Sequence, residues 1–171
     1  MSESPAAEHR AEGPARMRIA VLTVSDTRTI ETDTSGALIL RLADEAGHEI
    51  VERAILPDEP ARMRPLLEAW RDRGTIDAVL VTGGTGIAAR DLTYETVSTL
   101  LTKPLPGYGE LFRMLSYQEI GPAAMLSRAL GGLMGRVVLL VMPGSRAAVE
   151  LAMTKLILPE LPHLAREARK R

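Results

Sequence analysis

Cysteine is absent from the 171-residue sequence. Its absence excludes disulfide bonds, cysteine-ligated zinc and thiol chemistry, and it is consistent with a reducing cytoplasm. Histidine is almost as scarce, because His9, His48 and His163 are scattered along the chain without the spacing of metal ligands. We therefore expect neither a histidine zinc site nor a histidine-based catalytic triad.

Long apolar runs and an excess of one charge are also missing. No run approaches the roughly 18 to 20 apolar residues that a membrane helix needs, so no membrane association is expected. The net charge of −1 offers no global field for binding nucleic acid. What remains is a composition typical of a soluble globular protein, 46% hydrophobic and 25% charged.

The first 16 residues differ from the rest of the chain. Residues 1–16 are polar, contain Pro5, Gly13 and Pro14, and lack the apolar core of a signal peptide. We interpret them as a disordered N-terminal tail. No internal repeat or further linker follows, so residues 17–171 are expected to form a single domain with its own core.

Apolar segments typical of buried strands alternate with segments whose apolar residues recur at helical spacing. The expected strands are residues 18–25, 49–56 and 77–82, and the expected helices are 36–46, 60–73 and 93–103. Thr34 or Ser35 is the expected cap of the first helix, and Thr93 that of the third. This alternation predicts an α/β fold with a mostly parallel sheet that is covered on both faces.

Residues 104–122 interrupt the alternation with a loop and a short helix near residues 109–117. Residues 124–133 fit a helix or a strand. We favour a strand, because its glycines would turn the chain back toward a strand at residues 137–142. That arrangement adds one antiparallel strand to the sheet. The chain is expected to end in two helices, at residues 147–157 and 159–169.

The segment from Val79 to Glu95, VLVTGGTGIAARDLTYE, carries the clearest signal for a ligand site. A buried strand leads into a loop formed by Thr82, Gly83, Gly84, Thr85 and Gly86. Glycine lets backbone amides approach an anion, and amides at a helix start attract phosphate. The carboxylates of Asp91 and Glu95 lie where a bound metal could use them. We therefore predict a site for phosphate and a metal ion.

Known phosphate motifs do not match this loop. A P-loop needs Gly-Lys-Ser or Gly-Lys-Thr at its end, but here Ile87 follows Gly86. The dinucleotide fingerprint needs a third glycine where Ala89 stands. A tight turn with a purely structural Arg90–Asp91 pair therefore remains an alternative to a binding site.

Other polar segments also follow expected strands, and ligands bind at the carboxyl ends of strands in an open parallel sheet. We expect these segments to converge with residues 82–91 on one site. The candidate binding residues outside the glycine loop are Ser25, Asp26, Ser35, Gly36, Arg90, Glu95, Pro143, Gly144 and Ser145. Capping a helix is an alternative role for Ser35 and the favoured role for Ser145.

Asp58 and Asp91 are the carboxylates that we pair as a metal site. Magnesium takes oxygen ligands, prefers one or two carboxylates and shares phosphate oxygens of a substrate. Such an ion would neutralise charge during transfer at a phosphorus centre. Asp58 could instead cap the helix that begins near Pro60, and an acid in the first turn can still face a pocket.

Most of the few aromatic residues lie together. Tyr94, Tyr108, Phe112 and Tyr117 are four of the five in the sequence. They gather in and beside the segment that interrupts the alternation, which fits a partner surface or a ligand wall. A small satellite core is an equally good explanation.

Seven motifs follow one another in the order of a known family: TVSDTR, DTSG, PDE, TGGTGIAARDLT, PGYGELFRMLSYQEIG, SRA and PGS, between Thr23 and Ser145. On these motifs, residues 17–160 resemble the MoaB/Mog family of molybdenum cofactor biosynthesis proteins. The GELFR.LSY.EIG segment makes the chain similar to the MoaB branch in particular.

The resemblance implies a three-layer α/β/α sandwich that binds molybdopterin, a pterin dithiolene with a terminal phosphate. Active members use Mg²⁺ and ATP to adenylylate that phosphate and release pyrophosphate. The family's two functional aspartates fall on Asp58 and Asp91, its glycine loop on Thr82–Gly86 and its PGS loop on Pro143–Ser145. Homo-oligomers, trimers or hexamers, are the rule in the family, and other molybdenum cofactor biosynthesis proteins are expected partners.

One position departs from the family pattern, which usually has proline where Tyr94 follows Thr93. Proline is favoured at a helix start but not required, so we expect the helix to survive and Tyr94 to be able to narrow the pocket. A cytoplasmic molybdopterin adenylyltransferase is the leading hypothesis from the sequence. A non-catalytic molybdopterin-binding carrier or scaffold is the alternative.

Overall fold

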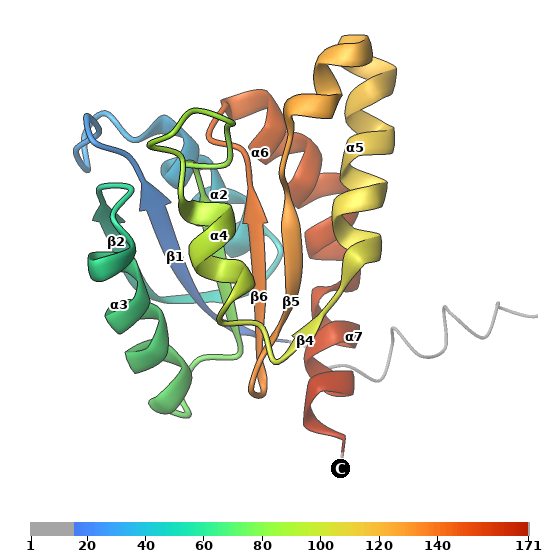
Figure 1. Cartoon of the computed structure of the whole chain (residues 1–171). Helices are drawn as coiled ribbons and strands as arrows, with labels where there is room; N and C mark the ends of the chain where they lie inside the picture. Colours follow the sequence, from blue (N-terminus) through green and yellow to red (C-terminus); the bar gives the residue numbers. More distant parts are fainter. Residues whose placement is uncertain (1–15, 171) are drawn as a thin grey trace, which may run out of the picture.

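A sheet of six strands forms the middle layer of the structure, a computed structural model that describes residues 16–170 (Figure 1). The strand order is β2-β1-β3-β6-β5-β4. The parallel strands are β1 (Arg18–Val24), β2 (Glu49–Leu56), β3 (Ala78–Thr82) and β6 (Val137–Met142). β5 (Leu130–Met134) runs antiparallel to β6 and to the short edge strand β4 (Lys103–Pro104). The predicted mostly parallel sheet with one antiparallel strand is confirmed.

Helices cover both faces of this sheet (Figure 1). One face carries α2 (Thr34–Glu45), α5 (Pro106–Ile120), α6 (Arg146–Ala152) and α7 (Leu158–Arg169). The other face carries α3 (Pro60–Asp72) and α4 (Thr93–Ser98). Successive residues of β6 point to opposite faces of the sheet. Leu140 packs in the apolar cluster beneath α2, α5, α6 and α7, and Leu139 packs in the cluster beneath α3 and α4. The three-layer α/β/α sandwich is therefore confirmed.

Two further expectations concern the N-terminal tail and membrane helices. The tail predicted at residues 1–16 lies outside the described residues, except for Arg16. Within residues 16–170, no helix is long and apolar enough to cross a membrane.

The segment that interrupts the alternation holds a longer helix than the sequence predicted. α5 has 15 residues and begins at Pro106, where the missing N–H of proline leaves no bond unmade. It ends at Gly121, whose φ of +63° stops the helix. Residues 121–126 then form a 3₁₀-helix, η1. The strand predicted at residues 124–133 therefore begins only at Leu130.

The end of the chain forms one continuous helical segment, so the prediction of two separate helices was wrong. α6, the π-helix η2 (Met153–Ile157) and α7 follow one another without a break. In an α-helix the ring of Pro159 would clash with the carbonyl four residues earlier. The wider π-turn at this place takes up that clash, so the helical path continues past the proline.

Asp77 ties the chain together at the edge of the sheet where β1 and β3 begin. Its carboxylate is almost fully buried and accepts hydrogen bonds from the backbone N–H (2.8 Å), Nε (3.1 Å) and Nη2 (2.8 Å) of Arg18. Arg169, in the last turn of α7, forms a second ion pair with it. Burial alone would raise the pKa of Asp77, but the hydrogen bonds and charge of Arg18, with the charge of Arg169, hold it below its usual value.

Asp77→Asn is expected to lower the free energy of unfolding at pH 7 by about 3 kcal/mol, because two arginines lose their buried partner. The folded-state pKa of Asp77 is depressed, so its stabilisation is full above the unfolded pKa of about 4 and fades as the pH falls through the folded pKa. Urea unfolding at pH 7 and pH 3 measures both effects. The control is Asp72→Asn, which changes an exposed carboxylate; equal losses from the two variants would contradict the prediction.

Candidate functional site

The loops after the parallel strands meet at the carboxyl edge of the sheet, as the sequence predicted. A cavity of about 270 Å³ opens between them. Its lining comes from the end of β1 and the loop that follows, from residues 82–86 after β3, and from Gly144 after β6. The lining residues are Thr23, Val24, Ser25, Arg28, Asp33, Ser35, Thr82, Gly83, Gly84, Thr85, Gly86 and Gly144.

The glycine loop has a backbone conformation that only glycine adopts readily. Gly83 has a φ of +100° and Gly84 a φ of +64°. A Cβ on Gly83 would also overlap the carbonyl oxygen of Val24 in β1. Consecutive backbone N–H groups that follow such residues form a concave nest suited to an anion.

The donors of this loop are free. Among residues 16–170, no acceptor faces the N–H groups of Gly84, Thr85, Gly86 or Ile87, whereas Gly83 donates to Met142 (3.1 Å). Buried backbone donors in proteins are nearly always paired, but Gly84 and Gly86 are partly exposed and Ile87 is exposed, so water or a ligand in the cavity can accept their bonds. The loop thus offers unpaired donors where the sequence predicted a phosphate site, and binding of phosphate there stays a prediction.

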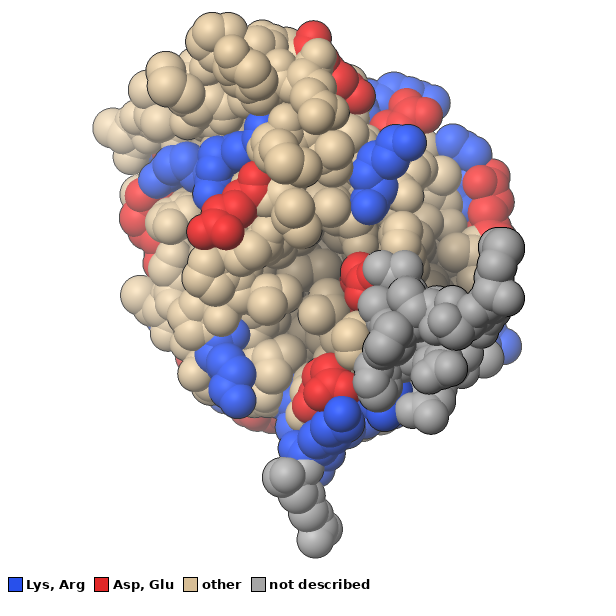
Figure 2. Space-filling model, turned by 90° about the vertical axis from the view of Figure 1, so that its right-hand side faces the viewer, with Lys and Arg blue, Asp and Glu red and all other residues tan. Residues whose placement is uncertain are grey.

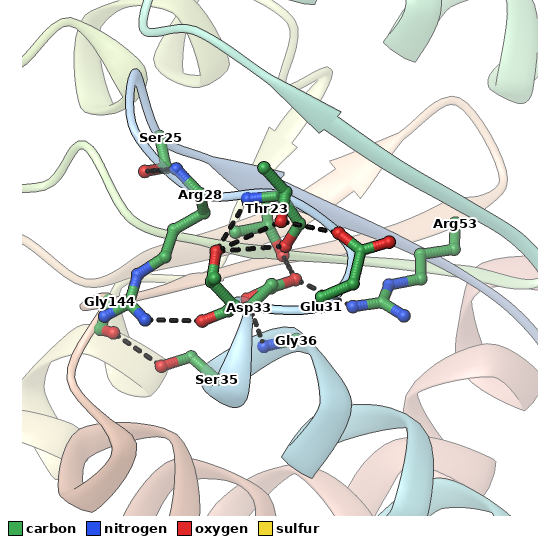
Figure 3. Close-up of polar contacts among 11 residues, drawn as sticks. Thr23, Ser25, Arg28, Glu31, Asp33, Ser35, Gly36, Arg53 and Gly144 are labelled. Atoms are coloured by element: carbon green, nitrogen blue, oxygen red, sulfur yellow. Dashed lines mark hydrogen bonds and ion pairs between the residues drawn. The ribbon is translucent and has the colours of Figure 1, made fainter.

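A buried carboxylate, that of Asp33, belongs to the lining of the cavity and is held by several polar contacts (Figure 3). Asp33, at 2% exposure, accepts hydrogen bonds from the hydroxyl of Thr23 (2.7 Å) and the backbone N–H of Gly36 (2.8 Å) and pairs with Arg53 (3.1 Å). Asp33 thus caps α2, a role that was predicted for Thr34 or Ser35. The Ser35 hydroxyl instead donates to the carbonyl of Gly144 (2.7 Å).

Three other predicted residues have structural roles. A Cβ on Gly36 would overlap Asp33 and Thr23, so glycine is required there for the cap of α2, and Gly36 does not line the cavity. Ser145 caps α6 by accepting the backbone N–H of Ala148 (3.2 Å), as favoured from the sequence. Pro143 contributes its carbonyl, which accepts the hydroxyl of Thr82 (3.1 Å).

Asp58 lies against the glycine loop. Its carboxylate accepts the backbone N–H of Leu92 (3.0 Å) and the hydroxyl of Thr93 (3.3 Å), and a Cβ on Gly84 would overlap it. Asp58 therefore serves the start of α4 and not the helix that begins at Pro60, and Thr93 does not cap α4 itself. Burial raises the pKa of Asp58 and the charge of Asp91 adds to this, while the hydrogen bonds from Leu92 and Thr93 oppose it.

Asp91 lies against the same glycine loop, at Gly86. A Cβ on Gly86 would overlap its carboxylate, which accepts the backbone N–H of Ala88 (3.0 Å). The structural Arg90–Asp91 pair that the sequence left open as an alternative does not form, because Arg90 pairs with Asp26 (2.7 Å) in the loop after β1. Arg90 and Asp26 thus join two loops of the site.

A divalent cation fits the pair Asp58 and Asp91 only with further ligands. Within residues 16–170, no three acidic or histidine side chains gather into a metal site. Mg²⁺ typically combines one or two carboxylates with phosphate oxygens of a substrate and water. Two carboxylates that keep unused lone pairs beside a phosphate-type loop satisfy that requirement.

Arg128 was not among the residues selected from the sequence, although it lies in the SRA motif. It pairs with Glu95 and bonds to backbone carbonyls of the glycine loop. Glu95 therefore contacts Arg128 and does not line the cavity, and its role in binding stays a prediction. The SRA motif signals Arg128 in the sequence, but its partners follow only from the structure, because Arg128 is 37 residues from Asp91 in the chain.

The four clustered aromatic residues have different surroundings in the structure, and none of them forms the separate satellite core that the sequence left open. Tyr108 and Phe112 of α5 are buried in the main core. Tyr117 is 61% exposed, on the outer side of the same helix. Tyr94 is half-exposed, and α4 forms despite the missing proline, as expected. Tyr94 does not line the cavity, so it does not narrow it.

Comparison with known proteins gives a consistent result. The model of a family described as "Probable molybdopterin binding domain" matches residues 20–163. A Bacillus subtilis protein named molybdenum cofactor biosynthesis protein B is 53% identical over 165 residues, which cover 95% of this chain and 96% of the relative. A protein of the same name from Halalkalibacterium halodurans is 51% identical over 164 residues, 95% and 96% of the two chains.

Solved structures agree. A crystal structure of a molybdenum cofactor biosynthesis protein B aligns with a TM-score of 0.90 at 50% identity, covering 94% of this chain and 100% of that one. The structure of the tungsten cofactor synthesizing protein MoaB from Pyrococcus furiosus aligns with a TM-score of 0.80 at 35% identity, covering 92% and 99%.

Proposed function

This chain belongs to the family of probable molybdopterin binding domains, and from that premise we propose that it adenylylates the terminal phosphate of molybdopterin with Mg-ATP. A role in molybdenum cofactor biosynthesis is the one for which its relatives are named. The observation that carries the proposal is the row of free amides at residues 84–87 beside a polar cavity. Such a loop suits a phosphate group.

The proposed reaction is a transfer at phosphorus. An oxygen of the pterin phosphate attacks the α-phosphorus of ATP, the bond from that phosphorus to the oxygen bridging to the β-phosphorus breaks, and pyrophosphate leaves. No general base is required, because a phosphate monoester is already ionised near pH 7. The amides of residues 84–87 would bind a phosphate and hold it in line for attack.

Asp58 and Asp91 would hold Mg²⁺. When bound, the ion supplies charge neutralisation on the triphosphate. Because both carboxylates lie against glycines of the same loop, a cation held by them would lie next to the phosphate bound by that loop. Arg28 lines the cavity and offers a further positive charge.

The larger neighbouring cavity supports a reaction with two substrates. It has a volume of about 490 Å³ and shares Ser25 and Arg28 with the first cavity. Arg53 and Arg62 also line it, so its charge favours an anion. Two adjoining cavities of this kind can accept two phosphorylated molecules side by side.

A non-catalytic molybdopterin carrier or scaffold is the second candidate. It is favoured by one observation: neither Asp58 nor Asp91 lines the cavity next to the glycine loop. Both carboxylates also hold backbone N–H groups of the 88–92 region, which is a structural task. The carrier would use the same free amides to bind the pterin phosphate.

Incubation of the purified chain with molybdopterin, ATP and Mg²⁺, followed by mass spectrometry, separates the two candidates. An adenylyltransferase gives adenylylated pterin and an equal amount of pyrophosphate. A carrier gives bound pterin and no product that depends on ATP. Absence of both product and pterin binding would refute both candidates.

An apolar surface on α5 and η1 supports the proposal that copies of this chain form a homo-oligomer. Exposed large hydrophobic residues gather there: Leu111, Met114, Tyr117, Ile120, Met125 and Leu126. Figure 2 shows a broad uncharged area at the top of the molecule, where Figure 1 places these elements. Patches of this kind usually mark protein contacts, and light scattering measures whether a trimer, a hexamer or a monomer forms.

A further inference from the structure

The side chain of Arg128 joins both arms of the loop that follows β3. Its Nε donates to the carbonyl of Thr85 (3.1 Å), and its Nη2 donates to the carbonyls of Gly86 (2.5 Å) and Asp91 (3.0 Å). The same guanidinium pairs with the carboxylate of Glu95, at the start of α4. One side chain, 23% exposed, therefore fixes four points along residues 85–95.

These bonds set the direction of the loop amides. A trans peptide is planar, so its C=O and the N–H of the next residue point in opposite directions. Because the carbonyls of Thr85 and Gly86 point to Arg128, the N–H groups of Gly86 and Ile87 point away from it. Both N–H groups belong to the free row described above, and Gly86 lines the cavity, whereas Arg128 does not.

Two neighbours hold Arg128 in place. The carboxylate of Glu95 forms an ion pair with the guanidinium, and the hydrogen bond from Arg128 lowers the pKa of Glu95. The ring of Tyr94 lies under the guanidinium, with the Cζ atom 5.0 Å from the ring centre, within the range of a cation–π contact. The position at which this chain departs from its family thus supports the same arginine.

We propose that Arg128 is a positioning residue for the glycine loop: it binds the carbonyl side of residues 85–91 so that the amide side faces the phosphate of the substrate. Its rigid fork of five donors can serve two carbonyl arms and a carboxylate together, which a lysine ammonium cannot do. The identity of the phosphate ligand rests on the proposed function, but the loop geometry does not.

Binding of molybdopterin and of its dephosphorylated form tests this role. Arg128→Gln is expected to weaken binding of molybdopterin about 10-fold and to leave binding of the dephosphorylated pterin unchanged, because only the phosphate contacts the misplaced amides. Arg128→Lys keeps the charge and should fail to restore the phosphate-dependent part. The matched control is Arg136→Gln, which removes an exposed arginine at the β5–β6 turn.

Hydrogen exchange measures the loop itself, independently of any ligand. The N–H of Ala88 donates to the carboxylate of Asp91, and the N–H of Asp91 donates to the carbonyl of Ala88. The N–H of Thr93 donates to the carbonyl of Gly84. In Arg128→Gln these protected amides should exchange at least about 10-fold faster, while peptides from β1 and β6 exchange as in the unchanged chain. Arg136→Gln should leave every peptide unchanged.

The outcomes are separable. If the wild-type chain binds pterin without making product, the adenylyltransferase proposal is refuted, and the role of Arg128 is still tested by pterin binding. If the wild-type chain binds both pterins equally, the proposed phosphate site is refuted. Hydrogen exchange alone then tests whether Arg128 orders the loop. If Arg128→Gln does not fold, Glu95→Gln, which removes only the partner carboxylate, should shift exchange in the same direction. Unchanged exchange and unchanged phosphate-dependent binding would overturn the proposal.

Discussion

Asp91→Asn is expected to lower the rate of adenylylated pterin formation by at least about 100-fold while the chain stays folded. Asparagine keeps an oxygen that can accept the N–H of Ala88, so the local turn is preserved. The variant loses the negative charge that would hold Mg²⁺ next to the glycine loop. Binding of molybdopterin alone should change by no more than a few-fold, because the loop amides remain free.

Mass-spectrometric product formation over time measures this effect, with pterin binding measured in parallel. Asp72→Asn removes a carboxylate on the exposed end of α3 and is the control that should retain full activity. Loss of turnover together with loss of pterin binding would indicate that Asp91 supports the loop and does not hold the metal. Normal turnover would remove Asp91 from the mechanism.

Gly84→Ala is expected to lower the free energy of unfolding by about 3 kcal/mol and to abolish phosphate-dependent binding. Alanine disfavours the φ of +64° at this position, and its Cβ would overlap Thr93 Oγ1 and the carboxylate of Asp58. To relieve both conflicts the loop must move away from α4. That movement displaces the amides and Asp58 together, so binding and catalysis are lost at once.

Gly47→Ala provides a matched control, because Gly47 has a φ of +83° with open space around its Cβ position. It lies at the opposite edge of the sheet, between α2 and β2. The strain alone should lower stability by about 1 kcal/mol and leave activity unchanged in folded protein. Thermal unfolding and pterin binding measure both variants, and equal effects on binding from the two would contradict a specific role of Gly84.

These predictions share one physical basis, a loop kept in an uncommon conformation from several sides. Gly84 accepts the N–H of Thr93 (3.2 Å), Asp58 contacts the same stretch of chain, and Arg128 binds its carbonyls. Each contact is made by a group from another element. Thr93 and Arg128 engage carbonyls of the loop, while the N–H groups of Gly84, Thr85 and Gly86, which line the cavity, have no partner among residues 16–170.

The sequence by itself determined the layered sheet and the position of the loop. Continuous apolar runs at β1, β3 and β6 indicated strands buried on both faces, and all three formed as predicted. Parallel strands separated by helices place their carboxyl ends on one edge, so convergence of the loops followed from topology. Gly83 and Gly84 marked the loop in the sequence, and the structure adds that both have positive φ values.

Tertiary structure alone decided which side chains meet at that edge and what each one does. Arg90 bonds to Asp26 and not to its neighbour Asp91, and Asp58 serves α4 rather than α3. Local patterns fix the backbone over a few residues, but a charged or polar side chain finds its partner by distance in space. The bonds from Arg128 to the glycine loop exist only because β5 folds back antiparallel to β6 and brings the residues before it to the carboxyl edge.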